Sequence, residues 1–358
     1  MHLYDLGWSK HWTETCPSID LNNIVRITEK HRGSFRAVGE HGKLTCFLSG
    51  KLEFGASTAA ELPAIGDWCR ISPPFQDAQG NAAIIEEVIP RRTSISRLAA
   101  GDSVEEQVLV ANVDFAFITS SANSELNISR LYRYIYLAKK GNVEPILVIS
   151  KADLLEDRTS LLEELKKQFK DLRILLCSSL NNEGLEELHA ILKAGSTAVF
   201  IGSSGVGKSS LVNALLQKEV QATKAIRSFD DKGQHTTSSG SLHFTSTGAM
   251  IVDTPGLREL QIFGDEEALG DLFQDVEKLT VQCKFSNCTH SQEPGCAILK
   301  AVEEGELSDL ELKRYDKMRR EIDFANRRVD QKLAAEQKSW HKKINTQHRQ
   351  KKKFESKF

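Results

Sequence analysis

The chain has 358 residues, of which 40% are hydrophobic and 27% are charged, a balance that excludes a disordered or fibrous protein and predicts two or three globular domains. It contains no run of about 18 apolar residues, and residues 1–13 lack the features of a secretion signal. We therefore expect a cytoplasmic protein. The net charge of −2 is unevenly distributed, because residues 313–358 hold 16 Lys and Arg against 6 Asp and Glu. Such a basic tail either meets phosphates or is a solvated helix that keeps the chain soluble.

The first part of the chain, from about residue 23 to residue 93, is predicted to form a small β-barrel. Segments rich in β-branched and aromatic residues alternate there with glycine-containing turns. The predicted strands span residues 24–28, 34–38, 44–48, 66–71 and 82–89. Five short strands suit a closed OB-like barrel, a fold that often carries oligonucleotides without proving that function.

From about residue 113 to residue 263 the pattern changes to buried strands that alternate with helices. Strands are predicted at 113–119, 145–149, 173–177, 198–201 and 250–253, and helices at 128–139, 158–170 and 209–217. This alternation predicts an α/β domain with a doubly wound sheet, in which ligands bind at the carboxyl ends of the strands. A cysteine-rich segment follows, and then a long polar helix that begins near residue 308.

Residues 202–209 fit the G-x-x-x-x-G-K-[ST] pattern of a phosphate-binding loop, and they lie between a predicted strand and a predicted helix as that motif requires. The glycines let successive backbone N–H groups point at the β-phosphate beside the helix N-terminus. Lys208 is expected to reach the β- and γ-phosphate oxygens, and the Ser209 hydroxyl to ligate Mg²⁺. The predicted nucleotide-binding residues of this segment are Gly202, Ser203, Ser204, Gly205, Val206, Gly207, Lys208, Ser209 and Ser210.

Two further segments carry the residues expected to respond to the γ-phosphate. A D-T-P-G segment ends the strand at 250–253, where the Asp253 carboxylate can hold Mg²⁺ through water and the Gly256 N–H can contact the γ-phosphate. The polar loop between the P-loop and this strand contains Thr236 and Thr237. Either threonine could complete the metal shell, and the sequence favours neither.

A base-reading segment decides between GTP and ATP, because a phosphate loop holds both. Ser150-Lys151-Ala152-Asp153 follows the strand at 145–149 and resembles the [NT]-K-x-D guanine motif. The Asp153 carboxylate would accept hydrogen bonds from guanine N1–H and the 2-amino group, a pair of donors that adenine lacks, while Lys151 would lie along the base. Ser150 replaces the usual Asn or Thr and loses the reach of an amide, so we expect weaker nucleotide affinity.

The order of these motifs along the chain differs from that of a Ras-like domain. Ser178 and Ser179 match the weak fifth motif, whose backbone contacts guanine O6, so both base segments precede the P-loop and the switches. A Ras-like domain runs instead from the P-loop to the switches and then to the base segments. The same site can be assembled from either order if the original chain ends are joined and new ends are cut elsewhere. The sequence therefore predicts a circularly permuted GTPase domain whose second switch leads into the C-terminal region.

A metal site is predicted after the GTPase domain. Cys283, Cys288, His290 and Cys296 offer three thiolates and one imidazole, the ligand set of a closed tetrahedral Zn²⁺ site. Four ligands leave no open position, so the predicted zinc is structural. The remaining cysteines stand singly among apolar neighbours and are interpreted as small buried hydrophobes, namely Cys16, Cys46, Cys69 and Cys177.

With these motifs in this order, the chain resembles the RsgA (YjeQ/YloQ) family of circularly permuted GTPases that assist assembly of the small ribosomal subunit. Local echoes are P-R-R-T at 90–93, E-E-Q-V-L-V-A-N-V-D at 105–114 and G-Q-H-T-T at 233–237. The resemblance covers nearly the whole chain and implies a multi-domain fold. Its expected parts are an OB-like β-barrel in residues 1–95, a permuted α/β P-loop GTPase domain in 96–265, and a mostly helical zinc-binding module with a basic C-terminal helix in 266–358.

The resemblance also implies function. It implies a GTPase that uses Mg²⁺ with GTP, carries one structural Zn²⁺, binds the 30S subunit and its 16S rRNA, and is stimulated by that subunit; we expect a monomer with no membrane association. The family is associated with a hydrophobic residue where Ras-like enzymes use a water-orienting Gln, and Leu257 fits that pattern. His235 is then our candidate for orienting the attacking water. Ser150, and Ser238 where relatives commonly have a third Thr, depart from the family pattern.

Two alternatives of other classes stay open. One is an RNA-binding scaffold whose nucleotide site is a weak regulator, an interpretation that Ser150 favours. The other is a P-loop ATPase, against which Asp153 argues. We expect slow turnover without an activator, because the sequence shows no obvious built-in group that would neutralise the charge developing during phosphoryl transfer.

Overall fold

The computed structural model describes residues 2–78, 80–98, 105–122, 126–217, 240–254, 262–264 and 267–329. The chain forms two compact units, which we describe separately. The first comprises Met1–Arg97 with Glu106–Gln261, and the second comprises Leu98–Glu105 with Ile262–Phe358. Within the described ranges, every helix is too short or too polar to cross a lipid bilayer.

Five strands of the first unit close into a barrel in the order β1-β2-β3-β6-β4, with β4 pairing back onto β1. Every ladder in the barrel is antiparallel except β3–β6, which is parallel, as in an OB-like fold. The five predicted strands are therefore confirmed. They are β1 (Ile24–His31), β2 (Ser34–Gly39), β3 (Gly42–Leu48), β4 (Trp68–Ile71) and β6 (Gly80–Val88), and the short β5 (Phe75–Asp77) pairs with β6.

The barrel core consists of alternate residues of these strands, such as Val25, Ile27 and Leu44. Burial raises the pKa of the Cys46 thiol to about 12. The predicted burial of single cysteines is confirmed for Cys46, Cys69 and Cys177, whereas Cys16 is half-buried. Short helices connect and cover the strands: η1 (Leu3–Leu6), α1 (Lys10–Thr15), η2 (Leu21–Asn23), α2 (Gly50–Gly55) and η3 (Ala59–Glu61).

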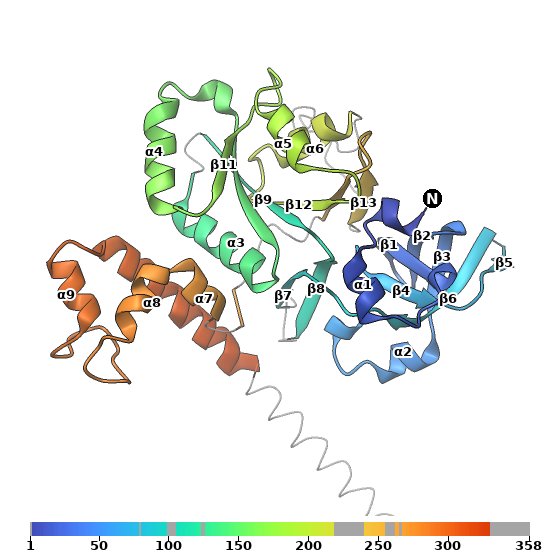
Figure 1. The fold of residues 1–358 in the computed structure, drawn as a ribbon, viewed down its shortest axis with the longest axis horizontal. Helices are drawn as coiled ribbons and strands as arrows, with labels where there is room; N and C mark the ends of the chain where they lie inside the picture. The colour runs from blue at the N-terminus through green and yellow to red at the C-terminus, as the bar shows by residue number, and fades with distance from the viewer. Residues whose placement is uncertain are drawn as a thin grey trace, which may run out of the picture. The chain divides into compact units, whose positions relative to one another are not determined.

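A six-stranded stretch of sheet with helices on both sides forms the rest of the first unit (Figure 1). Its order is β11-β10-β9-β12-β14-β13, and all its ladders are parallel except β13–β14. The strands are β9 (Phe115–Ser121), β10 (Glu144–Ser150), β11 (Arg173–Leu176), β12 (Thr197–Ile201), β13 (Ser241–Phe244) and β14 (Met250–Asp253). The predicted doubly wound sheet is confirmed. The sequence did not reveal β13, or the two-stranded ribbon of β7 (Ser94–Leu98) and β8 (Glu106–Ala111).

Helices follow the strands as the alternation predicts. Figure 1 shows α3 and α4 on one side of the sheet and α5 and α6 on the other. Phe117 and Val148 share a buried core with Leu188 of α5 and Leu211 of α6. The helices are α3 (Ile128–Lys140), η4 (Ala152–Leu154), α4 (Arg158–Gln168), α5 (Leu185–Ile191) and α6 (Lys208–Leu216).

The barrel joins the α/β sheet through one strand pairing and one buried arginine. Glu29 of β1 pairs with Ser241 of β13, so the barrel continues the sheet at its β13 edge. The fully buried Arg26 guanidinium donates hydrogen bonds to the carbonyls of Leu6, Gly66 and Asn112, with the closest at 2.5 Å. Burial lowers the pKa of Arg26 to about 10. Because its partners come from the N-terminal segment, the barrel and the α/β domain, Arg26 holds three segments in one arrangement.

The second unit is mostly helical. It contains α7 (Glu267–Leu272), α8 (Gln274–Thr280), α9 (Ala297–Glu303) and a helix at 309–329. The last helix buries every third or fourth residue, including Tyr315, whose ring packs edge-on against Phe273 at 5.6 Å between centroids and whose hydroxyl donates to Glu277. The predicted fold class, a barrel followed by an α/β domain and a helical region with a cysteine cluster, is confirmed.

Candidate nucleotide site and metal centre

The predicted nucleotide segments meet at one edge of the α/β sheet. Strands β9, β10, β12 and β14 run parallel, so their carboxyl ends lie together. The P-loop follows β12, the Ser150–Asp153 segment follows β10, and Asp253 ends β14. Segments some 50 residues apart in the sequence are thus neighbours. The edge therefore brings together the residues predicted to bind the phosphates and those predicted to bind the base of a nucleotide.

The P-loop has the backbone that its glycines predict. Gly207 adopts a φ of 91° immediately before α6, a left-handed conformation that side chains rarely adopt. A Cβ at Gly202 would lie 2.2 Å from the Thr119 carbonyl oxygen, so that position also requires glycine. The Lys208 ammonium folds back over the loop and donates to the carbonyls of Gly202, at 2.7 Å, and Ser203, at 2.6 Å. The lysine therefore lies at the mouth of the loop, where it can exchange carbonyl oxygens for phosphate oxygens.

Ser150 links the base segment to the P-loop. Its side chain is buried, and its hydroxyl lies within hydrogen-bond distance of the carbonyls of Ser120, at 3.1 Å, and Val206. A hydroxyl has a single proton, so it donates to one carbonyl at a time or shares the proton between them. The short side chain thus fits between β9 and the P-loop and fastens the two motifs together. This contact gives Ser150 a structural role that the motif comparison did not reveal.

The other base-segment residues are held by local contacts. Lys151 adopts a left-handed backbone with a φ of 56°, an unusual conformation for a non-glycine residue, and its ammonium donates to the Gly205 carbonyl at 3.0 Å. Asp153 is exposed, and one of its carboxylate oxygens accepts from the Ser178 hydroxyl at 2.5 Å. The Ser178 contact brings the two predicted base segments together and fixes the orientation of the Asp153 carboxylate. Ala152 is buried, and its N–H donates to the Cys177 carbonyl.

Some of the residues predicted to hold Mg²⁺ belong to the part of the chain that the structure describes, and the others do not. Ser209 lies in the first turn of α6, and within the described ranges its hydroxyl has no hydrogen-bond partner. Asp253 is half-buried, and the neighbouring Thr254 hydroxyl is buried without a partner among the described residues. A hydroxyl and a carboxylate at this edge are oxygen donors of the kind that Mg²⁺ prefers. The predicted His235, Thr236, Thr237, Gly256 and Leu257 lie outside the described residues.

Sequence reasoning missed one residue that contacts the P-loop. Arg130, in the first turn of α3, donates a hydrogen bond from its guanidinium to the Ser203 hydroxyl. No motif marks this arginine, because it lies 73 residues before its partner and only the packing of α3 brings the two together.

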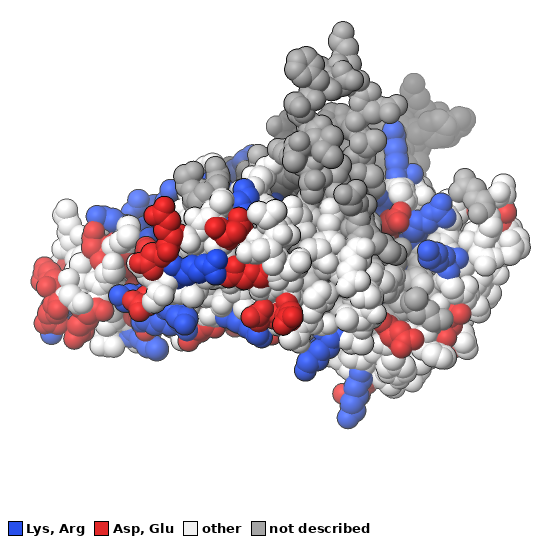
Figure 2. All heavy atoms as spheres, turned by 90° about the horizontal axis from the view of Figure 1, so that it is seen from above, with Lys and Arg blue, Asp and Glu red and all other residues white. Residues whose placement is uncertain are grey.

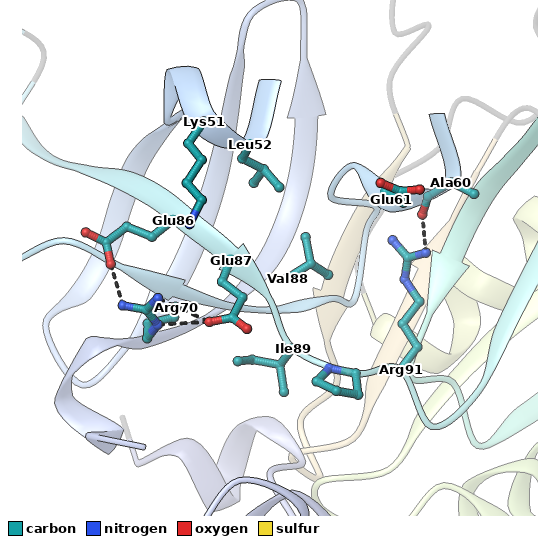
Figure 3. Close-up of a pocket in the computed structure, with 11 residues that line it drawn as sticks. Lys51, Leu52, Ala60, Glu61, Arg70, Glu86, Glu87, Val88, Ile89 and Arg91 are labelled. Atoms are coloured by element: carbon teal, nitrogen blue, oxygen red, sulfur yellow. Dashed lines mark hydrogen bonds and ion pairs between the residues drawn. The ribbon is translucent and has the colours of Figure 1, made fainter. Parts of the chain in front are cut away.

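A pocket of about 580 Å³ lies on the barrel, between β4, β6 and the segment that carries α2 and η3 (Figure 3). Its charged residues are three bases and three acids, namely Lys51, Arg70, Arg91, Glu61, Glu86 and Glu87. Arg70 is bonded to both Glu86, at 2.5 Å, and Glu87, at 3.1 Å. Because the cations are matched by carboxylates, this pocket lacks the positive excess that phosphate binding needs, and the P-loop edge remains the better nucleotide site.

The predicted metal ligands converge in the second unit. One ligand atom from each of Cys283, Cys288, His290 and Cys296 lies within 4.8 Å of every other. The Sγ atoms of Cys283 and Cys296 are 3.9 Å apart, and His290 Nδ1 lies 3.6 Å and 3.5 Å from them. Around a tetrahedral Zn²⁺ with ordinary bond lengths, the edges between sulfurs are about 3.8 Å and those from sulfur to nitrogen about 3.6 Å. The donor set and its spacing therefore fit one zinc ion.

Within the cluster, local contacts favour the thiolate form of Cys283, whereas the pKa of Cys288 is raised to about 11, first by desolvation. Although burial acts to raise it, the pKa of Cys283 is lowered, because backbone N–H groups of Ala297 and Ile298 and the neighbouring thiols stabilise the thiolate. His290 has a left-handed backbone with a φ of 60°, and Gly295 has a φ of 78°. These two turns bring ligands that are separated in the chain into one small loop.

Comparison with known proteins identifies the family. A family model described as RsgA GTPase matches residues 88–263. The small ribosomal subunit biogenesis GTPase RsgA of Opitutus terrae is 35% identical over 351 residues, which are 96% of this chain and 96% of that protein. This chain belongs to the RsgA GTPase family. The predicted family and its enzyme class, GTP hydrolase, are thereby confirmed.

Solved structures agree with this assignment. YjeQ from Thermotoga maritima is 29% identical, with a TM-score of 0.62, over 83% of this chain and 96% of its own. YloQ, described as a circularly permuted GTPase, has a TM-score of 0.56 at 23% identity over 86% of this chain and 95% of its own, and so shows the same fold. In this chain the base segment at 150–153 precedes the P-loop at 202–209, which is the order that the sequence analysis predicts for a circularly permuted domain. The division at residues 95 and 265 stays a prediction.

The Ser150 contacts predict the effect of removing its hydroxyl. S150A should weaken binding of GDP and GTP alike, by about fivefold, since one buried hydrogen bond between the motifs is worth about 1 kcal/mol and the tether does not depend on the γ-phosphate. Fluorescent-nucleotide titration measures both affinities. S160A, at an exposed serine of α4 outside the nucleotide-binding set, is the control and should bind normally. If S150A bound nucleotide with wild-type affinity, the Ser150 hydroxyl would not hold the two motifs together. Tighter binding by S150N would support the expectation that serine at this position lowers nucleotide affinity.

The metal cluster predicts that thiol substitutions will act on the second unit. Elemental analysis should find one zinc ion in the wild type and none in C296S. The variant should also have a weaker helical signal in circular dichroism, because a small unit depends on its metal for part of its stability. Nucleotide affinity should stay within about twofold, as no predicted nucleotide residue lies in that unit. C16S, at a half-buried cysteine of the first unit, is the control and should keep its zinc. An unchanged metal content in C296S would contradict the proposed ligand set.

Proposed function

We propose that this chain hydrolyses GTP in the cytoplasm and uses that reaction in the biogenesis of the small ribosomal subunit. The observation that carries the proposal is the convergence of the P-loop, the Ser150–Asp153 segment and Asp253 at one sheet edge in a member of the RsgA family. The relative from Opitutus terrae is named a small ribosomal subunit biogenesis GTPase, and this chain matches it along nearly its whole length.

In this proposal each segment of the edge has one task. P-loop N–H groups hold the β-phosphate, Lys208 holds the β- and γ-phosphates, and Asp153 reads guanine with Ser178 fixing its carboxylate. Mg²⁺, held by Ser209 and through water by Asp253, would neutralise phosphate charge. Gly202 through Ser210, together with Ser150, Lys151, Ala152 and Ser179, complete the nucleotide-binding set. Thr236, Thr237 and Gly256 are proposed to close over the γ-phosphate, and His235 to orient water.

We further propose three functional parts: a barrel in residues 1–95, a GTPase domain in 96–265 and a zinc-binding module in 266–358. The cysteine cluster would hold one structural Zn²⁺, because its four ligands leave no position for substrate. We propose that the protein acts as a monomer and that the third part contributes to binding of 16S rRNA.

The helix at 309–329 supplies a surface suited to RNA. Its buried face is apolar, while the opposite face exposes Lys317 and Arg320 beside Phe324, with the Arg328 guanidinium over the Phe324 ring at 5.9 Å. Lys313 on the same helix is paired with Asp309 at 2.6 Å, so a carboxylate already matches its charge. Cations track phosphates, and an exposed aromatic ring offers a stacking surface for bases. On the face of the molecule drawn in Figure 2, acidic and basic side chains are interspersed among the described residues. We propose this basic face, which holds Lys317, Arg320 and Arg328, as the candidate surface for RNA contact.

The proposed function predicts GTP hydrolysis that purified 30S subunits accelerate by at least about tenfold, with little ATP hydrolysis. Phosphate release with and without subunits measures it. D153N should lower GTP affinity by about 100-fold or more, because the amide would present a donor where guanine also donates. Binding without stimulated turnover would favour the RNA-binding scaffold instead, and a preference for ATP would contradict the assignment of the base segment.

The basic face predicts a salt-sensitive association with rRNA. K317A/R320A should weaken 30S binding and reduce the slope of log affinity against log salt by about 2, because each cation that pairs with a phosphate contributes about one unit of slope. Binding measured between low and physiological salt gives both quantities. K10A/K166A removes the same charge from exposed lysines of α1 and α4 and should leave the slope unchanged. Equal slopes in the two double variants would rule this face out as an RNA-binding surface.

A further inference from the structure

Among the described residues of the nucleotide edge, Arg130 is one whose contact no motif explains. It lies in the first turn of α3, where the Asn127 side chain accepts a hydrogen bond from its backbone N–H at 3.0 Å and so fixes the start of the helix. Its guanidinium donates to the Ser203 hydroxyl in the first turn of the P-loop. The side chain is half-buried, so it retains access to the mouth of the site.

Two cations meet at Ser203. The Ser203 carbonyl accepts from the Lys208 ammonium at 2.6 Å, and its hydroxyl accepts from Arg130. Lys208 is the P-loop lysine, whose partners in catalysis are the β- and γ-phosphates. Arg130 and Lys208 therefore contact the same P-loop residue, Ser203, and Lys208 is the side chain expected to hold the terminal phosphate.

The charge of Arg130 is not used elsewhere in the described part of the protein. Several other arginines of the first unit are matched by carboxylates, as Arg158 is by Glu183, Arg92 by Asp114 and Arg91 by the buried Asp67. Arg26 and Arg36 bond neutral groups instead, but neither lies at the nucleotide edge. Among the described residues Arg130 has no acidic partner and bonds a neutral hydroxyl. A hydroxyl tether alone needs no charge, whereas a guanidinium fork matches phosphate oxygens and stays protonated at any physiological pH.

We propose that Arg130 stabilises, from within the same chain, the charge that develops on the phosphates when GTP is cleaved. The inference rests on the proposed GTP hydrolysis and deepens it. Water oxygen forms a bond to the γ-phosphorus, the bond from that phosphorus to the β–γ bridging oxygen breaks, and its electron pair stays on the β-phosphate of GDP. The water proton leaves with the released inorganic phosphate or the solvent. Arg130 transfers no proton, and its positive charge lowers the energy of the transition state.

Single-turnover GTP hydrolysis in the presence of 30S subunits tests the proposal with the full-length chain. R130Q removes the charge and shortens the side chain but keeps an amide that can form hydrogen bonds. It should lower the rate constant at saturating protein by about 100-fold, with GDP affinity within about twofold, because GDP lacks the phosphate that is transferred. R130K should keep part of the rate. Circular dichroism and thermal melting establish that each variant folds.

Two matched variants separate charge from tethering. R130K keeps the positive charge, whereas R130Q keeps only a neutral hydrogen-bonding group, so R130K should retain at least about tenfold more of the rate than R130Q. K166Q removes one exposed charge from α4 and should have no effect. The proposal is overturned if R130Q behaves like K166Q, if R130K loses as much of the rate as R130Q, or if R130Q weakens GDP binding as much as it slows hydrolysis. A wild-type chain that binds GTP but does not cleave it would instead contradict the proposed function itself.

Discussion

The position of β12 between β9 and β14 is the constraint on which the nucleotide site depends. Ala198 of β12 pairs with Phe115 of β9 on one side and with Ile251 of β14 on the other. These parallel ladders align the carboxyl ends of three strands, and β10 adds a fourth through its pairing with β9. The P-loop, the base segment and Asp253 must then meet at one edge, whatever their order in the chain. Circular permutation changes the connections between strands but leaves these lateral hydrogen bonds unchanged.

The edge strand β13 of the α/β sheet carries the junction with the barrel. Strand β13 is the sheet edge next to β14, and it is there that β1 of the barrel pairs. The barrel thus adds to the α/β sheet through the single pair of Glu29 and Ser241, and the buried Arg26 bonds reinforce the junction. An exposed sheet edge invites pairing with other chains, and the barrel covers this one. The N-terminal part of the protein therefore completes the sheet as well as forming its own core.

Hydrogen bonds made by serine hydroxyls connect several segments around the P-loop. Ser150 spans from β10 to the Val206 carbonyl, Ser178 holds Asp153, and Ser203 accepts from Arg130. Each contact joins segments that are far apart in sequence. In the second unit, three thiols and one imidazole at metal-ligand spacing connect the loop in the same way. Both solutions fix loops whose own residues bury too little apolar surface to hold them still.

The sequence by itself determined the features whose signals are local. The glycine spacing of the P-loop, the Lys-Ala-Asp run after a strand and the four metal ligands are each encoded within a few residues, because backbone conformation and ligand geometry impose short fixed spacings. The barrel and α/β strands were evident for a similar reason, since buried strands are continuous runs of apolar or alternating residues. Family membership followed from the unusual order of these motifs.

Tertiary structure alone decided how these pieces act on one another. Motif comparison treats Ser150 as a shortened Asn, whereas packing places its hydroxyl against the P-loop carbonyl of Val206. Arg130 carries no local signal, since its partner is 73 residues away and only the docking of α3 against the sheet brings it to Ser203. Strand β13 is too short and too polar to be evident from periodicity, and its pairing with β1 and β14 creates it. Such long-range contacts depend on the whole fold, which no short stretch of sequence encodes.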